Sequence, residues 1–393
     1  MPTFCHLSSY IETRLQARDP VIDSFFAAEA ASLSLACREM SERFLRGGRL
    51  LAFGRGPFAT DAQHVSVEFV HPVIVGKRAL PALDLSMSFR PWLEALLRPD
   101  DMVMGFAPVE GDSEIEEVIQ LAHARGAMTF ALPGGAASYA MTPCTNDPFL
   151  HQEIVEILYH TLWETVHVFF EHRELGHDVG EAEFLYPFLG REKQETSGIL
   201  DQVANSIRMK ASDDVRLRAQ VIRAESERIS AAILAIQKRL TAGGKLIIFG
   251  NGGSATDAND FAIDCVAPPP GLVPVPAISL SAEPANITAI ANDVGNDLIF
   301  LRQLVAHAKP NDVVVAISTS GGSRNLLAAL TEARKLGLLS IALLGYDGGE
   351  IKRRNLADFP IVVEADYIPR IQEVQASIYH TMREAIEVAR HHD

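Results

Sequence analysis

The chain has 393 residues, 48% of them hydrophobic and 22% charged, which is the composition of a globular protein long enough for two domains. The formal net charge of −15 argues against non-specific binding to nucleic acid or to an anionic membrane surface. We expect no membrane span, because no apolar run approaches ~20 residues, and the first residues lack a signal-peptide pattern. The four cysteines are scattered and form no C-x-x-C pair, so we expect free thiols in a cytoplasmic protein.

The first half of the chain shows helix and strand patterns in alternation. Apolar residues recur at helical spacing between 21 and 46, and Gly47-Gly48 ends that helix. A short strand is predicted over 49–53, followed by the loop GRGPF and a helix that begins ATDA. Strands that alternate with helices predict an α/β fold with a mainly parallel sheet. Residues 174–198, rich in Gly, Glu and Lys, are predicted to be a linker that partly packs.

Segments of the first half recur in the second. The tetrapeptide ATDA stands at 59–62 and again at 255–258, and the triplet YHT stands at 159–161 and again at 379–381. These recurrences indicate a tandem duplication. The first half is shorter in its middle, where it has no counterpart of the helical stretch 286–305, so we expect it to have lost part of its substrate cover.

The second half is predicted to begin with one or two helices over 199–240 and to end with a helix over 370–390. In flavodoxin-like order the first and third strands are neighbours, and ligands bind beyond their carboxyl ends. Apolar, β-branched runs predict the strands, over 245–249, 277–280, 312–317, 340–344 and 360–363.

A glycine- and hydroxyl-rich loop follows the first and third of these strands, and a helix pattern follows each loop. Amides and hydroxyls that converge at a helix N-terminus bind anions, most simply phosphate. Neither loop has the third glycine of a dinucleotide motif or the lysine of a P-loop, so we expect a small phosphorylated sugar rather than ATP or NAD. For either loop alone, a Gly-Ser turn without a ligand is the alternative. The predicted phosphate-binding residues are Asn251, Gly252, Ser254, Ser318, Thr319, Ser320 and Ser323.

The segments GNGGSATDA, PAISLS, AIANDVGND, ISTSGGSRN, LLGYDGGE and RIQEV, in this order, resemble the sugar isomerase (SIS) domain and, within it, the phosphoheptose isomerase branch. The resemblance covers about residues 200 to 393 and, with the repeat, implies two tandem SIS domains. Each is expected to be a flavodoxin-like three-layer αβα sandwich with a mainly parallel five-stranded sheet. We expect a degenerate SIS domain over 1–173, a linker over 174–198, and an SIS domain with phosphate-binding loops over 199–393.

The resemblance also implies a zinc site in the first half. Eight residues span about 12 Å of helix axis, so ligands at 152 and 160 share an ion only at full side-chain reach or across two copies of the helix. The alternative to a metal site is that these residues are left over from the duplication and that the histidines form hydrogen bonds inside a core. By the family pattern the metal ligands are His64, Glu68, Gln152 and His160.

The second half departs from this pattern. It has Asp260 and Asp264 at the His and Glu positions, and for these a solvated helix face is the alternative to a ligand role. It keeps Gln372 and His380, and by the resemblance Gln372 and Asp293 contact substrate. The first half has instead lost its phosphate loops: GRGPF replaces GNGGS, and acidic residues at 110 and 112 would repel phosphate.

These features together predict an aldose–ketose isomerase for a sugar phosphate, resembling sedoheptulose 7-phosphate isomerase. By the resemblance Glu68 is the base, His160 or His380 the acid, and zinc the electrophile, in one composite site built from both halves. The alternative is a non-catalytic protein that binds a sugar phosphate or recruits a protein partner, in a regulatory or maturation role. Because the family is tetrameric, we expect a homodimer of tandem chains.

Overall fold

The computed structural model describes residues 4–73, 77–174 and 196–390. It divides into two compact units: unit 1 comprises residues 1–18 and 214–393, and unit 2 comprises residues 19–213. Most of the predicted linker, 175–195, lies outside the described residues. The units differ from the predicted domains because the first residues of each long helix, at 4–18 and at 196–213, belong to the unit formed mainly by the other half of the chain.

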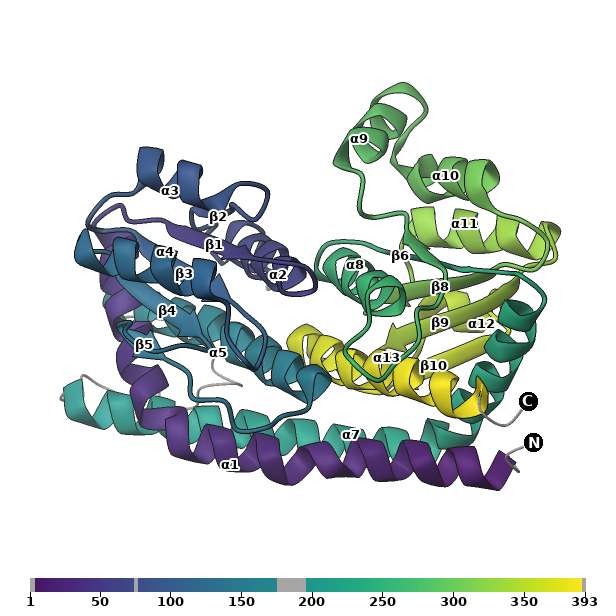
Figure 1. The fold of residues 1–393 in the computed structure, drawn as a ribbon, viewed down its shortest axis with the longest axis horizontal. Helices are drawn as coiled ribbons and strands as arrows, with labels where there is room; N and C mark the ends of the chain where they lie inside the picture. The colour runs from purple at the N-terminus through teal and green to yellow at the C-terminus, as the bar shows by residue number, and fades with distance from the viewer. Residues whose placement is uncertain (1–3, 74–76, 175–195, 391–393) are drawn as a thin grey trace. The chain divides into compact units, whose positions relative to one another are not determined.

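Unit 2 is a parallel sheet covered by helices (Figure 1). Its strand order is β2-β1-β3-β4-β5, and β1 pairs with β3 from Leu50↔Met102 to Gly54↔Phe106. The elements are α1 (Phe4–Leu45), β1 (Leu50–Gly54), α2 (Phe58–Val70), β2 (Ala82–Asp84), α3 (Phe89–Leu96), β3 (Met102–Phe106), α4 (Ser113–Ala124), β4 (Met128–Leu132), β5 (Tyr139–Ala140) and α5 (Pro148–Glu174).

Unit 1 repeats this order as β7-β6-β8-β9-β10, again with every pairing parallel. Both units therefore confirm the flavodoxin-like arrangement, in which the first and third strands are neighbours. The elements are α7 (Thr196–Thr241), β6 (Leu246–Gly250), α8 (Gly253–Val266), β7 (Ala277–Ser279), α9 (Pro284–Asp293), η1 (Asn296–Leu298), α10 (Ile299–His307), β8 (Val313–Ser318), α11 (Arg324–Lys335), β9 (Leu339–Gly345), α12 (Gly349–Arg353), β10 (Phe359–Val363) and α13 (Ile368–Arg390).

The central strands are unbroken apolar runs because helices cover both faces of each sheet. Every residue of β1, β3 and β4 in unit 2 is buried, as is every residue of β6 and β8 in unit 1. Alternate residues of a strand face opposite sides, so each unit has two apolar clusters. In unit 2, for example, Leu50 and Ala52 belong to one cluster and Leu51 and Phe53 to the other.

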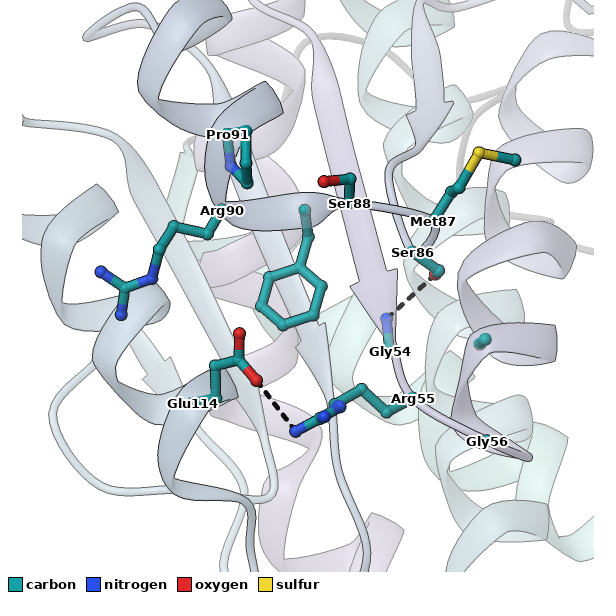
Figure 2. A pocket seen from close by; sticks show the side chains of 11 residues that line it. Gly54, Arg55, Gly56, Ser86, Met87, Ser88, Arg90, Pro91 and Glu114 are labelled. Atoms are coloured by element: carbon teal, nitrogen blue, oxygen red, sulfur yellow. Dashed lines mark hydrogen bonds and ion pairs between the residues drawn. The ribbon is translucent and has the colours of Figure 1, made fainter.

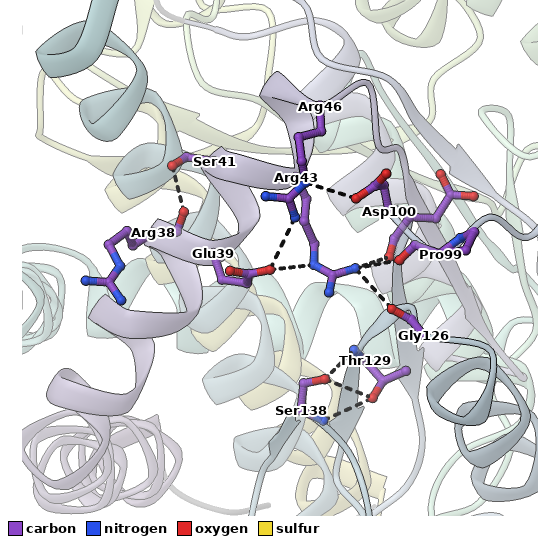
Figure 3. Close-up of polar contacts among 11 residues, drawn as sticks. Arg38, Glu39, Ser41, Arg43, Arg46, Pro99, Asp100, Gly126, Thr129 and Ser138 are labelled. Atoms are coloured by element: carbon purple, nitrogen blue, oxygen red, sulfur yellow. Dashed lines mark hydrogen bonds and ion pairs between the residues drawn. The ribbon is translucent and has the colours of Figure 1, made fainter.

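Polar side chains fix the amino ends of the strands in both units. In unit 2 the Arg43 guanidinium donates hydrogen bonds to the carbonyls of Pro99, Asp101 and Gly126 at 2.8, 3.3 and 3.4 Å (Figure 3). Arg239 in unit 1, which follows Arg43 by the same offset that separates the two ATDA tetrapeptides, donates in the same way to the carbonyls of Pro310 and Gly337. The same contacts at equivalent positions fit the predicted repeat.

Helix α1 begins at Phe4 rather than at the predicted start, position 21, since it continues through Pro20. Part of it, His6–Leu45, is long and apolar enough to cross a membrane by length and composition alone. Its apolar side chains have a different explanation, because Leu7 and Ile11 lie in the core of unit 1 and Phe26 lies in the core of unit 2. A core helix accounts for the pattern.

Candidate functional site

Two loops meet at the carboxyl edge of the unit 1 sheet. Strands β6 and β8 end together, with Gly250 opposite Ile317, so the loops 250–254 and 318–323 leave the sheet at neighbouring points. The side-chain amides of Asn251 and Asn325 donate to each other at 3.0 and 2.9 Å and connect the first loop to α11. Helices α8 and α11 start at these loops, so the amides of both helix N-termini lie at this edge.

The second loop is held in a conformation that only glycine adopts without strain. The amide of Gly321, at φ +60°, donates to Ser318 Oγ at 3.0 Å, and its carbonyl accepts from the amide of Ile351 at 2.9 Å. A Cβ at position 321 would lie 2.3 Å from the carbonyl oxygen of Gly348. The loop LGYDGGE, residues 344–350, therefore packs against the predicted phosphate loop at Gly321. Thr319 and Ser320 are not buried.

Unit 1 also brings two aspartates and a histidine together. His380 Nε2 on α13 lies 3.4 Å from Asp260 Oδ2 and 3.3 Å from Asp264 Oδ2, both on α8. Tyr379 Oη donates to Asp260 Oδ2 at 2.9 Å. Burial, followed by the charge of Asp260, raises the pKa of the Asp264 carboxyl from 3.8 to about 7. The two aspartates are thus not on a solvated helix face, the alternative weighed for them from the sequence.

Unit 2 has a cluster of its own at the equivalent positions. The Nε2 atoms of His64 on α2 and His160 on α5 lie 3.3 Å apart, and His64 Nε2 lies 3.8 Å from Glu68 Oε1. All three side chains are buried. Burial, with His160 beside it, lowers the pKa of His64 well below its ordinary value, so His64 is neutral at pH 7 and can offer a lone pair.

One member of the unit 2 cluster was missed in the sequence. Glu156 offers a carboxylate oxygen within 4.8 Å of ligand atoms of His64 and His160. It lies on α5 halfway between Gln152 and His160. Glu156 is only one turn from His160, so the two can share an ion without the eight-residue span that separates Gln152 from His160. The Gln152 amide instead donates to Asp61 Oδ2 at 3.1 Å. Glu156 could have been found only by asking which residue shares a helix face with both.

The donor atoms of both clusters suit a divalent metal. Two imidazole nitrogens with carboxylate oxygens form a donor set that zinc accepts, and the unit 2 cluster offers this set. The unit 1 cluster, with two aspartates and one histidine within 4.8 Å of one another, is richer in oxygen and is a harder set. Each unit therefore holds residues that fit a metal ion.

The loops of unit 2 differ from those of unit 1 at the same edge. Arg55 stands where unit 1 has Asn251, and it pairs with Glu114 at 2.9 Å (Figure 2). It also lies 3.4 Å from Asp112. A cavity of about 430 Å³ opens beside this pair and is lined by Gly54, Arg55, Ser86, Ser88, Arg90 and Glu114. Asp112 and Glu114 neutralise the arginine, which disfavours a phosphate there; Asp112 is one of the two acidic residues expected to repel it.

The two predicted substrate residues lie in different surroundings. Asp293 is exposed at the end of α9, where it accepts a hydrogen bond from Asn292. Gln372 is buried in the first turns of α13, two turns before His380. Among the predicted phosphate residues, Ser254 and Ser318 are buried and Asn251 and Ser320 are exposed.

This fold, with hydroxyl-rich loops at the switch point of a parallel sheet, defines an SIS domain protein, and the SIS domain model matches residues 212–345. Phosphoheptose isomerase of Citrifermentans bemidjiense is 44% identical over 167 residues, which are 41% of this chain and 84% of that protein. Phosphoheptose isomerase of Thermodesulfovibrio yellowstonii is 38% identical over 190 residues, 47% of this chain and 92% of that protein. The chain belongs to the phosphoheptose isomerase family.

Solved structures are similar to this chain over nearly its whole length. The C-terminal domain of glucosamine-fructose-6-phosphate aminotransferase from Francisella tularensis aligns with 97% of this chain and 96% of its own, with a TM-score of 0.57 at 11% identity. At that identity the similarity is one of fold alone. It supports the arrangement of two parallel α/β sheets in one chain.

Proposed function

We propose that this protein interconverts an aldose and a ketose that carry a phosphate group, as an enzyme similar to sedoheptulose 7-phosphate isomerase. The observation that carries the proposal is the pair of loops at the ends of β6 and β8, where hydroxyls and amides converge at two helix N-termini. The phosphate only anchors the sugar, so these loops supply binding and orientation rather than chemistry. Ser318, Thr319, Ser320 and Ser323 would surround the anion.

The reaction needs a base that removes the proton next to the carbonyl and an acid that protonates the enediolate oxygen. In the unit that holds the loops, the carboxyl of Asp264 has a pKa of about 7, so it can exchange a proton near neutral pH. It lies on α8, the helix that starts at the first loop, about 16 Å along the axis from that start. His380 beside it can hold the second proton.

Unit 2 offers Glu68 as base and His160 as acid, the roles predicted from the family pattern. His64, His160 and Glu156 would hold a zinc ion, which would supply a Lewis acid for the carbonyl oxygen of the sugar. With His160 engaged as a ligand, the acid would be His380, the other residue predicted for that role. One composite site that joins these groups to the loops of unit 1 is part of the proposal, as are the homodimer of tandem chains and the cytoplasmic location.

A non-catalytic role is the second candidate, because the ionisable groups of both clusters are buried. His64, Glu68 and His160 are 2%, 1% and 0% exposed, and Asp264 and His380 are 1% and 0% exposed. A substrate reaches such groups only if the protein opens. Under this reading the loops of unit 1 bind a sugar phosphate as an effector.

A substrate panel separates the two functions. The purified chain is incubated with sedoheptulose 7-phosphate and with shorter ketose and aldose phosphates, each paired with its unphosphorylated sugar, and products are separated by chromatography. We expect interconversion of a phosphorylated sugar only, and a rise in KM with little change in kcat for Ser320→Ala, because its hydroxyl is placed for phosphate. Binding of sugar phosphate without interconversion would favour the effector role.

A further inference from the structure

The first turns of the two long helices each belong to the unit formed mainly by the other half of the chain. Residues 4–18 of α1 are part of unit 1, whose sheet comes from the second half. Residues 196–213 of α7 are part of unit 2, whose sheet comes from the first half. We call 4–174 the first repeat and 196–390 the second, following the recurrences in the sequence.

The two segments are equivalent in the predicted repeat. The offset between the two ATDA tetrapeptides places α1, Phe4–Leu45, over 200–241, a range that lies within α7. The apolar positions of the first segment are Leu7, Ile11 and Leu15, all 0% exposed in the core of unit 1. The same offset leads from these positions to Val203, Ile207 and Ala211, which are buried in the core of unit 2.

The charged contacts of the two segments are equivalent as well. In unit 1 Arg14 pairs with Glu384 on α13, with Nε donating to Oε2 at 3.0 Å, and Arg18 lies 3.9 Å from the same carboxylate. In unit 2 Lys210 pairs with Glu164 on α5, and both side chains are buried. Lys210 follows Arg14 by the offset of the ATDA tetrapeptides, and Glu384 follows Glu164 by the offset of the YHT triplets.

We infer that the two repeats exchange their first helical segments. Residues 4–18 of the first repeat complete the helical core around the second repeat's sheet, and residues 196–213 of the second repeat complete the core around the first repeat's sheet. Equivalent apolar positions and equivalent ion pairs occur in both directions, which is the pattern of a reciprocal exchange between two copies of one fold. The inference does not depend on the proposed isomerase activity.

The exchange places a contact from the other repeat one turn away from each buried cluster. Glu384 lies four residues after His380 on α13, and Glu164 lies four residues after His160 on α5. Residues four apart lie on one face of a helix. Arg14 and Lys210 are therefore positioning residues. Each comes from one repeat and holds the helix that carries the cluster histidine of the other repeat.

Charge reversal in the full-length chain tests the exchange, since the unexchanged arrangement would pair Arg14 with Glu164. The variants are Arg14→Glu alone, Arg14→Glu with Glu384→Arg, and Arg14→Glu with Glu164→Arg as the matched control. Hydrogen exchange of backbone amides is followed in α13 and in α5. We expect Arg14→Glu to speed exchange in the second half of α13 by about tenfold and leave α5 unchanged, with rescue by Glu384→Arg only.

Faster exchange in α13 without rescue by either partner would still support the inference, because it identifies the helix that the segment contacts. Three outcomes would overturn it: faster exchange in α5 instead of α13, rescue by Glu164→Arg, or unchanged exchange in both helices. The reciprocal variant Lys210→Glu should act on α5 and spare α13.

Discussion

Two glycines of the predicted phosphate loops give a matched pair of substitutions. Gly252 and Gly321 both have a positive φ, +57° and +60°, which L side chains rarely adopt. A Cβ at Gly252 would have no described heavy atom within 4 Å, whereas a Cβ at Gly321 would lie 2.3 Å from the carbonyl oxygen of Gly348. Alanine at 252 therefore costs only the strain of a sparsely populated backbone conformation, about 1 kcal/mol. Alanine at 321 adds a backbone displacement, for a total of about 3 kcal/mol.

Differential scanning calorimetry measures both costs in the intact chain. For a unit of about 200 residues, 1 kcal/mol corresponds to about 2–4 °C in Tm, so we expect a decrease of about 3 °C for Gly252→Ala and about 9 °C for Gly321→Ala. Titration calorimetry with inorganic phosphate should show weaker binding for Gly321→Ala, because the loop must move. Equal melting temperatures for the two variants would refute the contact with Gly348 and the loop conformation built on it.

Three further predictions concern buried charged groups. Asp264 has a folded pKa of about 7 against 3.8 unfolded, so the folded protein becomes less stable as pH rises from 3.8 to 7 and the unfolded state loses its proton first. The stability of Asp264→Asn relative to wild type should therefore rise by roughly 3 kcal/mol between pH 5 and pH 8, in thermal melts with EDTA. A difference that stays constant with pH would contradict the shift. His160→Ala should lose one zinc ion per chain by elemental analysis and Gln152→Ala should keep it, whereas loss in both would make Gln152 a ligand. Asp101 is fully buried and accepts a hydrogen bond from the Arg49 side chain at 2.7 Å. Asp101→Asn should lower the free energy of unfolding by about 3 kcal/mol, and a urea midpoint equal to that of wild type would refute this.

The sequence predicts the sheets well because the physical signal is local. Unbroken β-branched runs require burial on both faces, and the loops that follow them mark the strand ends, so β6 and β8 lie within one residue of the predicted 245–249 and 312–317. The apolar spacing predicts a helix from residue 21, just after Pro20, and a proline inside a helix removes a hydrogen bond. Helix α1 begins at Phe4, because apolar side chains on both sides of Pro20 pack into cores.

The site is predicted less completely because its residues are joined by packing rather than by spacing. Comparison of the two halves finds only residues that recur, and Glu156 has an alanine, Ala376, at the equivalent position. The segment 4–18 was not predicted as a helix, and helical spacing alone does not say which core receives such a segment. Both features depend on contacts between segments far apart in the chain.

Deuterium incorporation from D₂O into a sugar phosphate tests the proposed chemistry most directly, because removal of the proton next to the carbonyl is its central step. Sedoheptulose 7-phosphate is incubated with the chain in D₂O and followed by NMR, with Gly321→Ala and unphosphorylated sedoheptulose as controls. The proposal predicts exchange at the carbon next to the carbonyl of the phosphorylated sugar, slowed in Gly321→Ala. Binding of the sugar phosphate with no exchange, at any pH between 6 and 8, would contradict it and leave a sugar-phosphate-binding protein.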